Sequence, residues 1–302
     1  MLRLLILCFF AATGAAAQTL RVDPPHWWVG TSVTRLELLV SSDSELSSVT
    51  VSAPGVVLVS DVPAANPRYR YVTVEVQPDA RPAKVALVAK SARGKVRTEW
   101  ELKARRTRTA APGLTQRDLM YLITPDRFAN ADAGNDDVAS MAERGVDRQK
   151  AYARHGGDLA GMTAQLDYLK SLGVTAVWPM PLLENNMPMA SYHGYAITDH
   201  YRVDPRYGSH KDYLGWVDGL HTRKMKAVKD MVFNHVGTGH YLYQSPPDSS
   251  WFNAWPSAPA TDARAKARGE ENPKFTSIHR YQTLFDPYAS ANDRERQMDG
   301  WF

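Results

Sequence analysis

Histidine, aromatic and charged side chains gather in residues 192–208 and suit the binding of a sugar. The segment contains Tyr192, His193, Gly194, Tyr195, Asp199, Tyr201, Asp204 and Arg206. An aromatic ring packs on the apolar C–H face of a pyranose, while charged and polar groups hydrogen-bond its hydroxyls. A packed loop with structural tyrosines explains the same residues, and the segment alone leaves both interpretations open.

A second candidate segment is 230–237, which begins with Asp230 and contains Asn234 and His235. It overlaps an apolar run, 225–233, that we expect to be a strand. Alternate residues of a strand share a face, so Asp230 and Asn234 would point the same way. Because buried polar groups need partners, they predict either a polar network near a barrel mouth or ordinary capping groups at a strand end.

Oxygen-bearing side chains crowd a third segment, 125–137. It contains Asp126, Asn130, Asp132, Asn135, Asp136 and Asp137. Calcium prefers such oxygen ligands, but the spacing is not that of an EF-hand, since Gly134 and Met141 stand where ligands are required. From these residues alone a polar turn is favoured over a cation site, because Asn, Asp and Gly are common turn formers.

The elements that must position these segments alternate between strands and helices. We expect strands at 119–124, 174–178 and 225–233, and helices at 159–172 and 210–222. This order indicates parallel βαβ units. The three candidate segments end these strands or follow them, and β/α barrels build their chemistry on that face.

The first part of the chain has a different pattern. Residues 18–104 alternate apolar and polar side chains, as in 72–77 and 96–103, with turns at 54–55 and 91–94. This pattern predicts a small all-β sandwich. Residues 105–117, basic and ending near Pro112 and Gly113, are expected to be a solvated linker.

Residues 1–17 have the composition of a signal peptide: one arginine, a short apolar run and an Ala-x-Ala end. A membrane anchor is the minor alternative, because the run is short for a span. We therefore expect an exported protein, periplasmic or extracellular, without disulfides, since the single cysteine is Cys8. A net charge of +4 gives no reason to expect nucleic acid, and no membrane contact is expected after cleavage.

The order and spacing of the motifs resemble the α-amylase superfamily, glycoside hydrolase family 13. Residues 24–30, 125–136 and 181–188 resemble its cyclomaltodextrinase and neopullulanase branch. The resemblance implies a multidomain protein with an N-terminal all-β immunoglobulin-like sandwich at 18–104. The start of a TIM (β/α)8 barrel would follow at 118–238, incomplete after the third strand, and 239–302 would be the excursion after that strand.

The resemblance also implies roles for individual residues. Tyr195 would stack on the sugar at the cleavage position, and His193 and His235 would contact its hydroxyls. Asp230 and Asn234 would support the site. Calcium would be held by Asn130, Asp132, Asn135, Asp136, Gly156 through its carbonyl, and Asp158. The implied partners are an α-glucan oligosaccharide and a second copy of the chain, bound through the N-terminal domain.

The two catalytic carboxylates of a retaining glycosidase, ~5 Å apart, have no match in these residues. The family's nucleophile lies in a Gly-x-Arg-x-Asp motif, which this sequence lacks. Glu184 matches a loop position instead, and the stretch after residue 118 is shorter than the ~250 residues of a barrel. We therefore expect an N-terminal fragment, inactive alone, of an enzyme that hydrolyses α-1,4 and, as a further expectation, α-1,6 glucosidic bonds.

Two other interpretations stay open. The first is a catalytically dead glucan-binding protein that keeps Tyr195 and the β domain for contact only. The second is a calcium-dependent interaction module in which Trp27 and Trp28 of the β domain do the binding.

Overall fold

A computed structural model describes residues 19–105 and 113–252 of the chain. The expected signal peptide with Cys8, most of the linker and the last part of the expected excursion lie outside these ranges. The chain divides into two compact units, residues 1–107 and 108–302. In the described ranges, no helix has the length and apolar character needed to cross a membrane.

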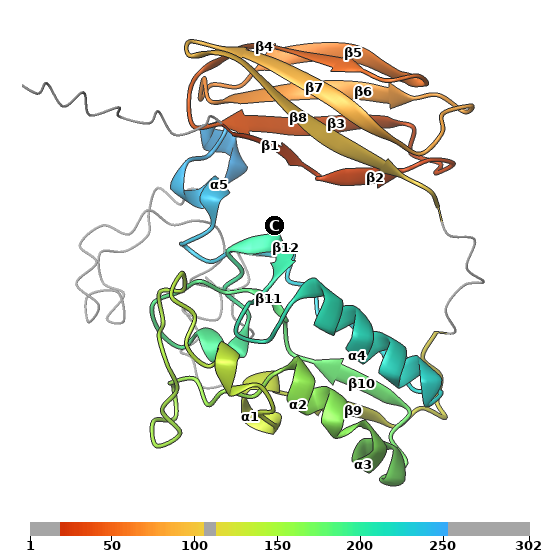
Figure 1. Ribbon diagram of the computed structural model, residues 1–302, viewed down its shortest axis with the longest axis vertical. Coiled ribbons are helices and arrows are strands. Elements are labelled where there is room, and N and C mark those ends of the chain that lie inside the picture. Colours follow the sequence, from red (N-terminus) through yellow and green to blue (C-terminus); the bar gives the residue numbers. More distant parts are fainter. Residues whose placement is uncertain (1–18, 106–112, 253–302) are drawn as a thin grey trace, which may run out of the picture. The chain divides into compact units, whose positions relative to one another are not determined.

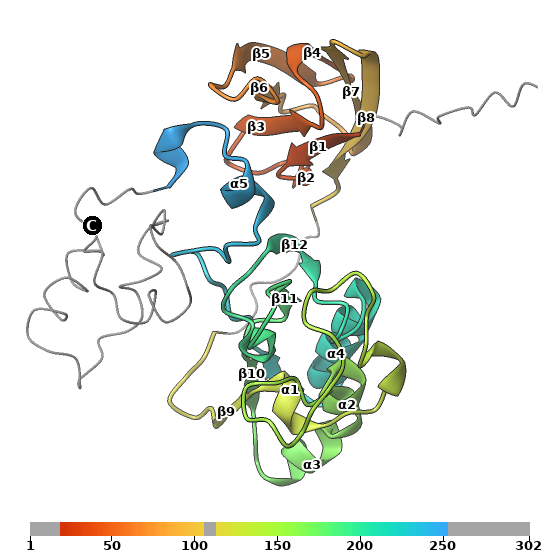
Figure 2. The same ribbon diagram turned by 90° about the vertical axis from the view of Figure 1, so that its left-hand side faces the viewer.

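The first unit, as far as it is described, consists of eight strands in two four-stranded sheets (Figures 1 and 2). The sheet orders are β1-β3-β6-β5 and β2-β8-β7-β4. The strands are β1 (Leu20–Asp23), β2 (His26–Trp28), β3 (Arg35–Ser42), β4 (Leu46–Ser52), β5 (Val56–Pro63), β6 (Tyr69–Val76), β7 (Ala83–Ser91) and β8 (Gly94–Lys103). The alternating runs 72–77 and 96–103 thus lie in β6 and β8, as predicted from their period of two.

One apolar core joins the two sheets. Val72, Val74 and Val76 of β6 face Val85 and Leu87 of β7 in a single buried cluster. The tight turn between β7 and β8 pairs Ser91 with Gly94, where the sequence placed it. Trp100 is fully buried, and its indole Nε1 donates a hydrogen bond of 2.9 Å to the Pro24 carbonyl, so its one polar group is satisfied.

The second unit contains a three-stranded parallel sheet in the order β13-β10-β9. Its strands are β9 (Met120–Ile123), β10 (Ala176–Pro179) and β13 (Lys226–Ala227). Because β10 pairs in parallel with both neighbours, the connections must cross over, and helices occupy those connections.

The expected helix over 159–172 is two helices, which corrects the prediction. α2 (Leu159–Ala164) and α3 (Leu166–Ser171) are separated at Gln165, whose φ of −96° and ψ of 7° leave the α-helical region. The apolar spacing was nevertheless informative, since Met162, Leu166 and Leu169 are all buried. α4 (His210–Thr222) has the predicted bounds, and Ser209 and Asp212 form a capping box at its start.

α2 and α4 pack against each other, and both contribute to one core with the parallel sheet (Figure 1). This core includes Ile123, Leu159, Met162, Leu166, Leu169, Val177, Trp216, Leu220 and Met225. The face of the sheet toward these helices is therefore buried. β9, by contrast, exposes Met120, Tyr121 and Leu122, the last at 56%.

The third strand is much shorter than predicted. The run 225–233 was expected to be extended throughout, but β13 ends at Ala227 and the ladder ends at the bond from Val228 N to Val177 O. Within the described residues β13 is the edge of its sheet, so the backbone beyond it lacks a ladder partner on the far side. Asp230 and Asn234 therefore do not share the face of a strand.

Short elements complete the second unit. They are α1 (Pro125–Phe128), η1 (Ala133–Asn135), β11 (Leu183–Glu184), η2 (Ser191–His193), β12 (Asp199–Val203), α5 (Tyr241–Gln244) and η3 (Ser249–Trp251). β11 and β12 pair antiparallel and bracket the loop that carries the expected sugar-binding residues. Of the expected excursion 239–302, only 239–252 is described.

Candidate functional site

The loop that carries His193 and Tyr195 is a short 3-10 turn closed by a glycine. η2 ends at Gly194, whose φ is +78° and whose N–H donates to the Ser191 carbonyl over 3.2 Å. A Cβ at Gly194 would collide with the Pro181 carbonyl oxygen. Both the backbone angle and the close approach therefore require glycine in the His-Gly-Tyr motif.

His193 and Tyr195 are held side by side. The Tyr195 N–H donates to His193 Nδ1 over 2.9 Å, and the two rings stack with centroids 6.0 Å apart. With Nδ1 accepting this bond, the neutral ring carries its proton on Nε2. That N–H is a donor of the kind that binds a sugar hydroxyl.

The segment after the third strand reaches Tyr195 through two polar contacts. The Tyr195 hydroxyl donates to Asp230 Oδ2 over 3.2 Å, and His235 Nε2 lies 3.1 Å from the Tyr195 carbonyl oxygen. Asp230 Oδ2 also accepts from Trp178 Nε1, on β10, over 3.0 Å. Four of the five predicted sugar-site residues therefore meet, from the loops after the second and third strands.

Asn234 is the exception. Its side chain is exposed and forms no hydrogen bond with any other described residue. The strand on which it was expected to share a face with Asp230 ends before either residue, which removes the reason for that expectation.

Burial sets the protonation of the gathered side chains. It lowers the pKa of His193, opposed by the nearby Glu143 carboxylate. It also lowers the pKa of His235, opposed by the hydrogen bond to the Tyr195 carbonyl. Burial, followed by the charge of Asp230, raises the pKa of Tyr195 to about 12. At neutral pH both imidazoles are therefore neutral and the phenol keeps its proton.

Glu184, the carboxylate set aside from the sequence, has a structural position. Its Oε2 pairs with Arg202 Nη1 at 3.2 Å, and its Oε1 accepts from the Thr198 hydroxyl at 3.2 Å. These bonds join β11 to β12 rather than presenting a free acid to the loop with Tyr195.

The predicted calcium residues lie in two neighbouring segments. Asn130 Nδ2 donates to Asp136 Oδ1 over 2.8 Å, and a Cβ on Gly156 would collide with both side chains. Asp132 and Asp158 are joined by the bond from Asp132 N to Asp158 Oδ2, 2.8 Å long. Asp158 also caps α2 by accepting from Gly161 N over 2.6 Å.

These residues fit a calcium ion by their donor chemistry. In the described part of the chain, His, Cys, Asp and Glu alone form no group of three that could hold a metal, so an ion here would also need amide and carbonyl oxygens. Asn135 Oδ1 is buried without a partner, which leaves one oxygen ligand unused. Turning the Asn130 side-chain amide over would present its oxygen, in place of its nitrogen, to an ion.

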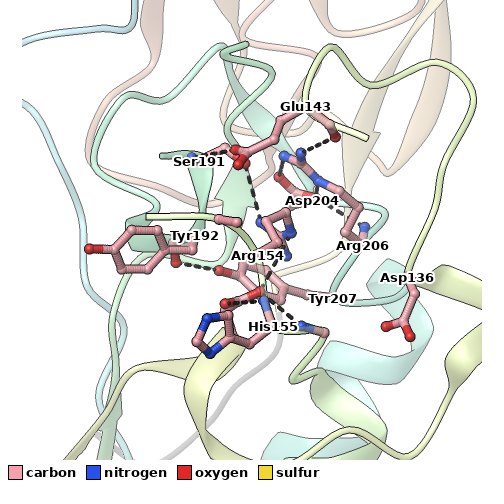
Figure 3. A network of polar contacts seen from close by, with 12 residues as sticks. Asp136, Glu143, Arg154, His155, Ser191, Tyr192, Asp204, Arg206 and Tyr207 are labelled. Atoms are coloured by element: carbon pink, nitrogen blue, oxygen red, sulfur yellow. Dashed lines mark hydrogen bonds and ion pairs between the residues drawn. The ribbon is translucent and has the colours of Figure 1, made fainter. Parts of the chain in front are cut away.

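A buried network that the sequence did not predict lies beside both segments (Figure 3). Arg206 pairs with Asp204 at 2.7 Å, and Arg154 Nε lies 3.6 Å from Asp126 Oδ1; all four side chains are almost fully buried. Asp204 and Arg206 belong to the segment 192–208, within the run Asp-Pro-Arg-Tyr-Gly, but charged residues are usually exposed and their types alone do not predict burial. Trp178, the donor to Asp230, was read only as a strand residue.

Comparison with known families agrees with this arrangement. The alpha amylase catalytic domain matches residues 122–283, and the cyclomaltodextrinase N-terminal domain matches residues 21–106. The chain belongs to the α-amylase family, glycoside hydrolase family 13, with a cyclomaltodextrinase-type N-terminal domain before the start of the catalytic domain.

Individual proteins are similar to parts of this chain. The cyclomaltodextrinase of Thermoanaerobacter pseudethanolicus is 30% identical over 206 residues, which cover 63% of this chain and 34% of the relative. Neopullulanase 2 of Thermoactinomyces vulgaris is 33% identical over 133 residues, covering 44% and 22%. A crystal structure of an Anoxybacillus α-amylase is 38% identical over 46% of this chain and 28% of its own, with a TM-score of 0.41. The chain spans about a third or less of the length of the curated relatives named here.

Proposed function

We propose that this chain supplies one side of the substrate site of an α-glucan hydrolase that acts on cyclodextrin, pullulan or starch oligosaccharides. The observation that carries the proposal is the meeting of His193, Tyr195, Asp230 and His235 at one place. The resemblance to the α-amylase family implies sugar binding for three of these residues and site support for Asp230. Membership of the α-amylase family supplies the reaction class.

Tyr195 provides the ring that packs on one face of a glucose unit. Its hydroxyl is engaged by Asp230 and its backbone N–H by His193, so the ring is fixed before substrate arrives. A fixed ring loses little conformational entropy on binding. The neutral imidazole of His193 lies next to this ring and that of His235 next to the Tyr195 carbonyl, and both are proposed partners for sugar hydroxyls.

Asp230 positions this ring and is not proposed as the nucleophile. Its Oδ2 already accepts from both Tyr195 and Trp178. A retaining mechanism requires a second carboxylate ~5 Å from the first, and the Gly-x-Arg-x-Asp motif of the family nucleophile is not in these 302 residues. The proposal therefore includes that the 302-residue chain does not itself hydrolyse glucan.

Calcium completes the proposal as a structural ion. Its ligands would be side-chain oxygens of Asn130, Asp132, Asn135, Asp136 and Asp158, with the Gly156 carbonyl. When bound, it would cross-link the segment 130–136 to the segment 156–158. Even without an ion, the hydrogen bonds of these residues hold the start of α2 and the backbone next to the buried Arg154 network.

The remaining expectations belong to the same proposal. They are export after cleavage near residue 17, a complete (β/α)8 barrel in the whole gene product, an immunoglobulin-like N-terminal sandwich, and dimer contact through that domain. α-1,4 bonds, and α-1,6 bonds as a further expectation, are the proposed targets.

The test compares the 302-residue chain with the product of the complete reading frame. Purified chain is expected to release no reducing sugar from β-cyclodextrin, pullulan or starch, whereas the complete product releases sugar with retained anomeric configuration. Release by the chain that is lost on changing one of its own residues would contradict the first part, and an inverted product the second. Binding without turnover in the complete product would favour the dead glucan-binding protein.

A further inference from the structure

Ser191 is bonded at all three of its polar positions, although it lies in a loop. Its N–H donates to Glu143 Oε2 over 2.7 Å, its carbonyl accepts from Asn185 Nδ2 over 3.1 Å, and its hydroxyl accepts from Arg154 Nη1 over 3.5 Å. The residue is 1% exposed. It is therefore a fixed point in the chain, four positions before Tyr195 (Figure 3).

The loop needs such a fixed point because its own backbone conformation is unfavourable. Ala190 has a φ of +54°, in the left-handed region that costs a non-glycine residue about 1 kcal/mol or more. Gly194 lies in the same region at the other end of the turn. Such conformations persist when surrounding contacts determine them, and here the contacts converge on Ser191.

Glu143 and Asn185 are themselves held by one buried side chain. Arg206 donates from Nη1 to the Glu143 carbonyl over 3.1 Å and from Nη2 to the Asn185 carbonyl over 2.8 Å. Asp204 pairs with Arg206 and also accepts from Asn185 N over 3.1 Å. Glu143 and Asn185, which bond the N–H and the carbonyl of Ser191, are thus both held by the buried ion pair of Asp204 and Arg206.

The position of Ser191 determines where the sugar-site residues that follow it lie. Ser191 begins η2, the Gly194 N–H bonds its carbonyl, and Tyr195 N bonds His193. Glu143 lies close enough to His193 for its charge to oppose the fall in the pKa of that imidazole. Tyr192, also in this turn, is fixed separately: its carbonyl accepts from Tyr207 and its ring lies 4.0 Å from the Arg127 guanidinium carbon.

We propose that Glu143 is a positioning residue for the glucan site: by accepting the Ser191 N–H it fixes the turn that presents His193 and Tyr195. Glu143 belongs to the long connection after β9, far in sequence from the turn. The inference rests on the proposed function, because the glucan site is what the turn would serve. The hold of Glu143 on the Ser191 N–H, called the Ser191 lock below, can be measured without any glucan.

Three substitutions of Glu143 distinguish the effect of where its acceptor oxygen lies from the effect of its charge. Glu143→Gln keeps an acceptor oxygen at the same reach and removes the charge. Glu143→Asp keeps the charge and withdraws the oxygens by one methylene. Glu143→Ala removes both, and Asp218→Ala, an exposed acid on α4, is the matched control.

Hydrogen exchange of the amides of 191–195 is the first measurement. Exchange is expected to stay at the wild-type rate in Glu143→Gln and Asp218→Ala, and to rise about tenfold or more in Glu143→Asp and Glu143→Ala, with α4 unchanged. Unchanged exchange in Glu143→Asp, which preserves the charge and is the milder of the two disruptive changes, would overturn the proposal even if Glu143→Ala did not fold.

The titration of His193, followed by NMR, is the second measurement. Glu143→Gln is expected to lower the pKa of His193 further, because the opposing negative charge is gone while burial remains. Glu143→Ala is expected to move that pKa back toward 6.5, because release of the turn relieves burial, the larger cause. Equal shifts in the same direction would show that Glu143 acts by charge alone and would overturn the proposal.

β-Cyclodextrin separates this inference from the proposed function. If the chain binds it, Glu143→Asp is expected to weaken binding and Glu143→Gln to preserve it; the reverse order contradicts the positioning role. If the chain does not bind it while exchange and titration follow the pattern above, the proposed function fails and the lock stands.

Discussion

The Tyr195 hydroxyl donates to Asp230 Oδ2 over 3.2 Å and thereby joins the loop after the second parallel strand to the segment after the third. Beneath this bond, Tyr195 and Met231 pack on a small buried cluster of Leu183, Ile197 and Val232. The Tyr195 side chain thus packs on an apolar cluster, and its hydroxyl is held by a hydrogen bond to Asp230. That arrangement leads to the following predictions.

Removing the Tyr195 ring should cost glucan affinity, whereas removing only its hydroxyl should mainly cost stability. Burying an aromatic face contributes on the order of 1.5–3 kcal/mol, so Tyr195→Ala should weaken β-cyclodextrin binding about tenfold or more. Tyr195→Phe keeps the ring and should lose about 1 kcal/mol of unfolding free energy. Calorimetric titration and urea unfolding measure the two effects. The exposed Tyr168→Ala is the control, and equal affinity in Tyr195→Ala would refute the stacking role.

Removing the Asp230 carboxylate should destabilise the second unit. Asp230→Ala leaves Trp178 Nε1 and the Tyr195 hydroxyl without their acceptor, at a cost of about 1–3 kcal/mol. Asp230→Asn retains an acceptor oxygen and should cost less. Urea unfolding followed by tryptophan fluorescence compares the variants with the exposed Asp218→Ala. An unfolding free energy of Asp230→Ala equal to that of the wild type would show that neither hydrogen bond contributes to stability.

Elements whose signals lie within a few neighbouring residues could be predicted from the sequence, whereas features that depend on distant residues could not. α4 was predicted at its observed bounds because its apolar spacing and start signals lie within residues 209–222. The sequence did not indicate the break at Gln165 or the early end of β13, since neither is marked by Gly or Pro and β13 is an edge strand of its sheet within the described residues. The meeting of Tyr195 with Asp230 was reachable because β/α topology places successive strand ends together. The contacts around Ser191 were not, because Glu143 and Arg154 lie far from Ser191 in sequence, in the irregular connection between β9 and α2.

Calcium should raise the melting temperature of the chain, and chelation should lower it. Binding to the folded state alone contributes about 2.7 kcal/mol when calcium is at 100 times its Kd. Asp132→Ala should abolish the effect, whereas Asp137→Ala, which removes an exposed acid paired with Arg144 in the same segment, should retain it. Differential scanning calorimetry with and without EDTA provides the measurement. A shift that survives Asp132→Ala would place the ion elsewhere.

Acidification should destabilise the second unit through His193 and His235. Burial depresses the pKa of both imidazoles, so the unfolded chain binds more protons than the folded one below 6.5. Stability must therefore rise with pH through that window, and it is lost as pH falls from 6.5 toward the lowered values. Melting temperatures between pH 8 and 5 should fall less steeply in His193→Gln than in wild type. An identical slope would contradict the contribution of His193.

The most direct test of the central claim is an NMR titration of the 302-residue chain with β-cyclodextrin. We expect saturable shifts at His193, Tyr195 and His235, with no shifts of that size on the exposed face of α4, and no hydrolysis during the titration. Absence of shifts at these three residues, or shifts confined to the N-terminal sheets, would contradict the claim that they form one side of a glucan site.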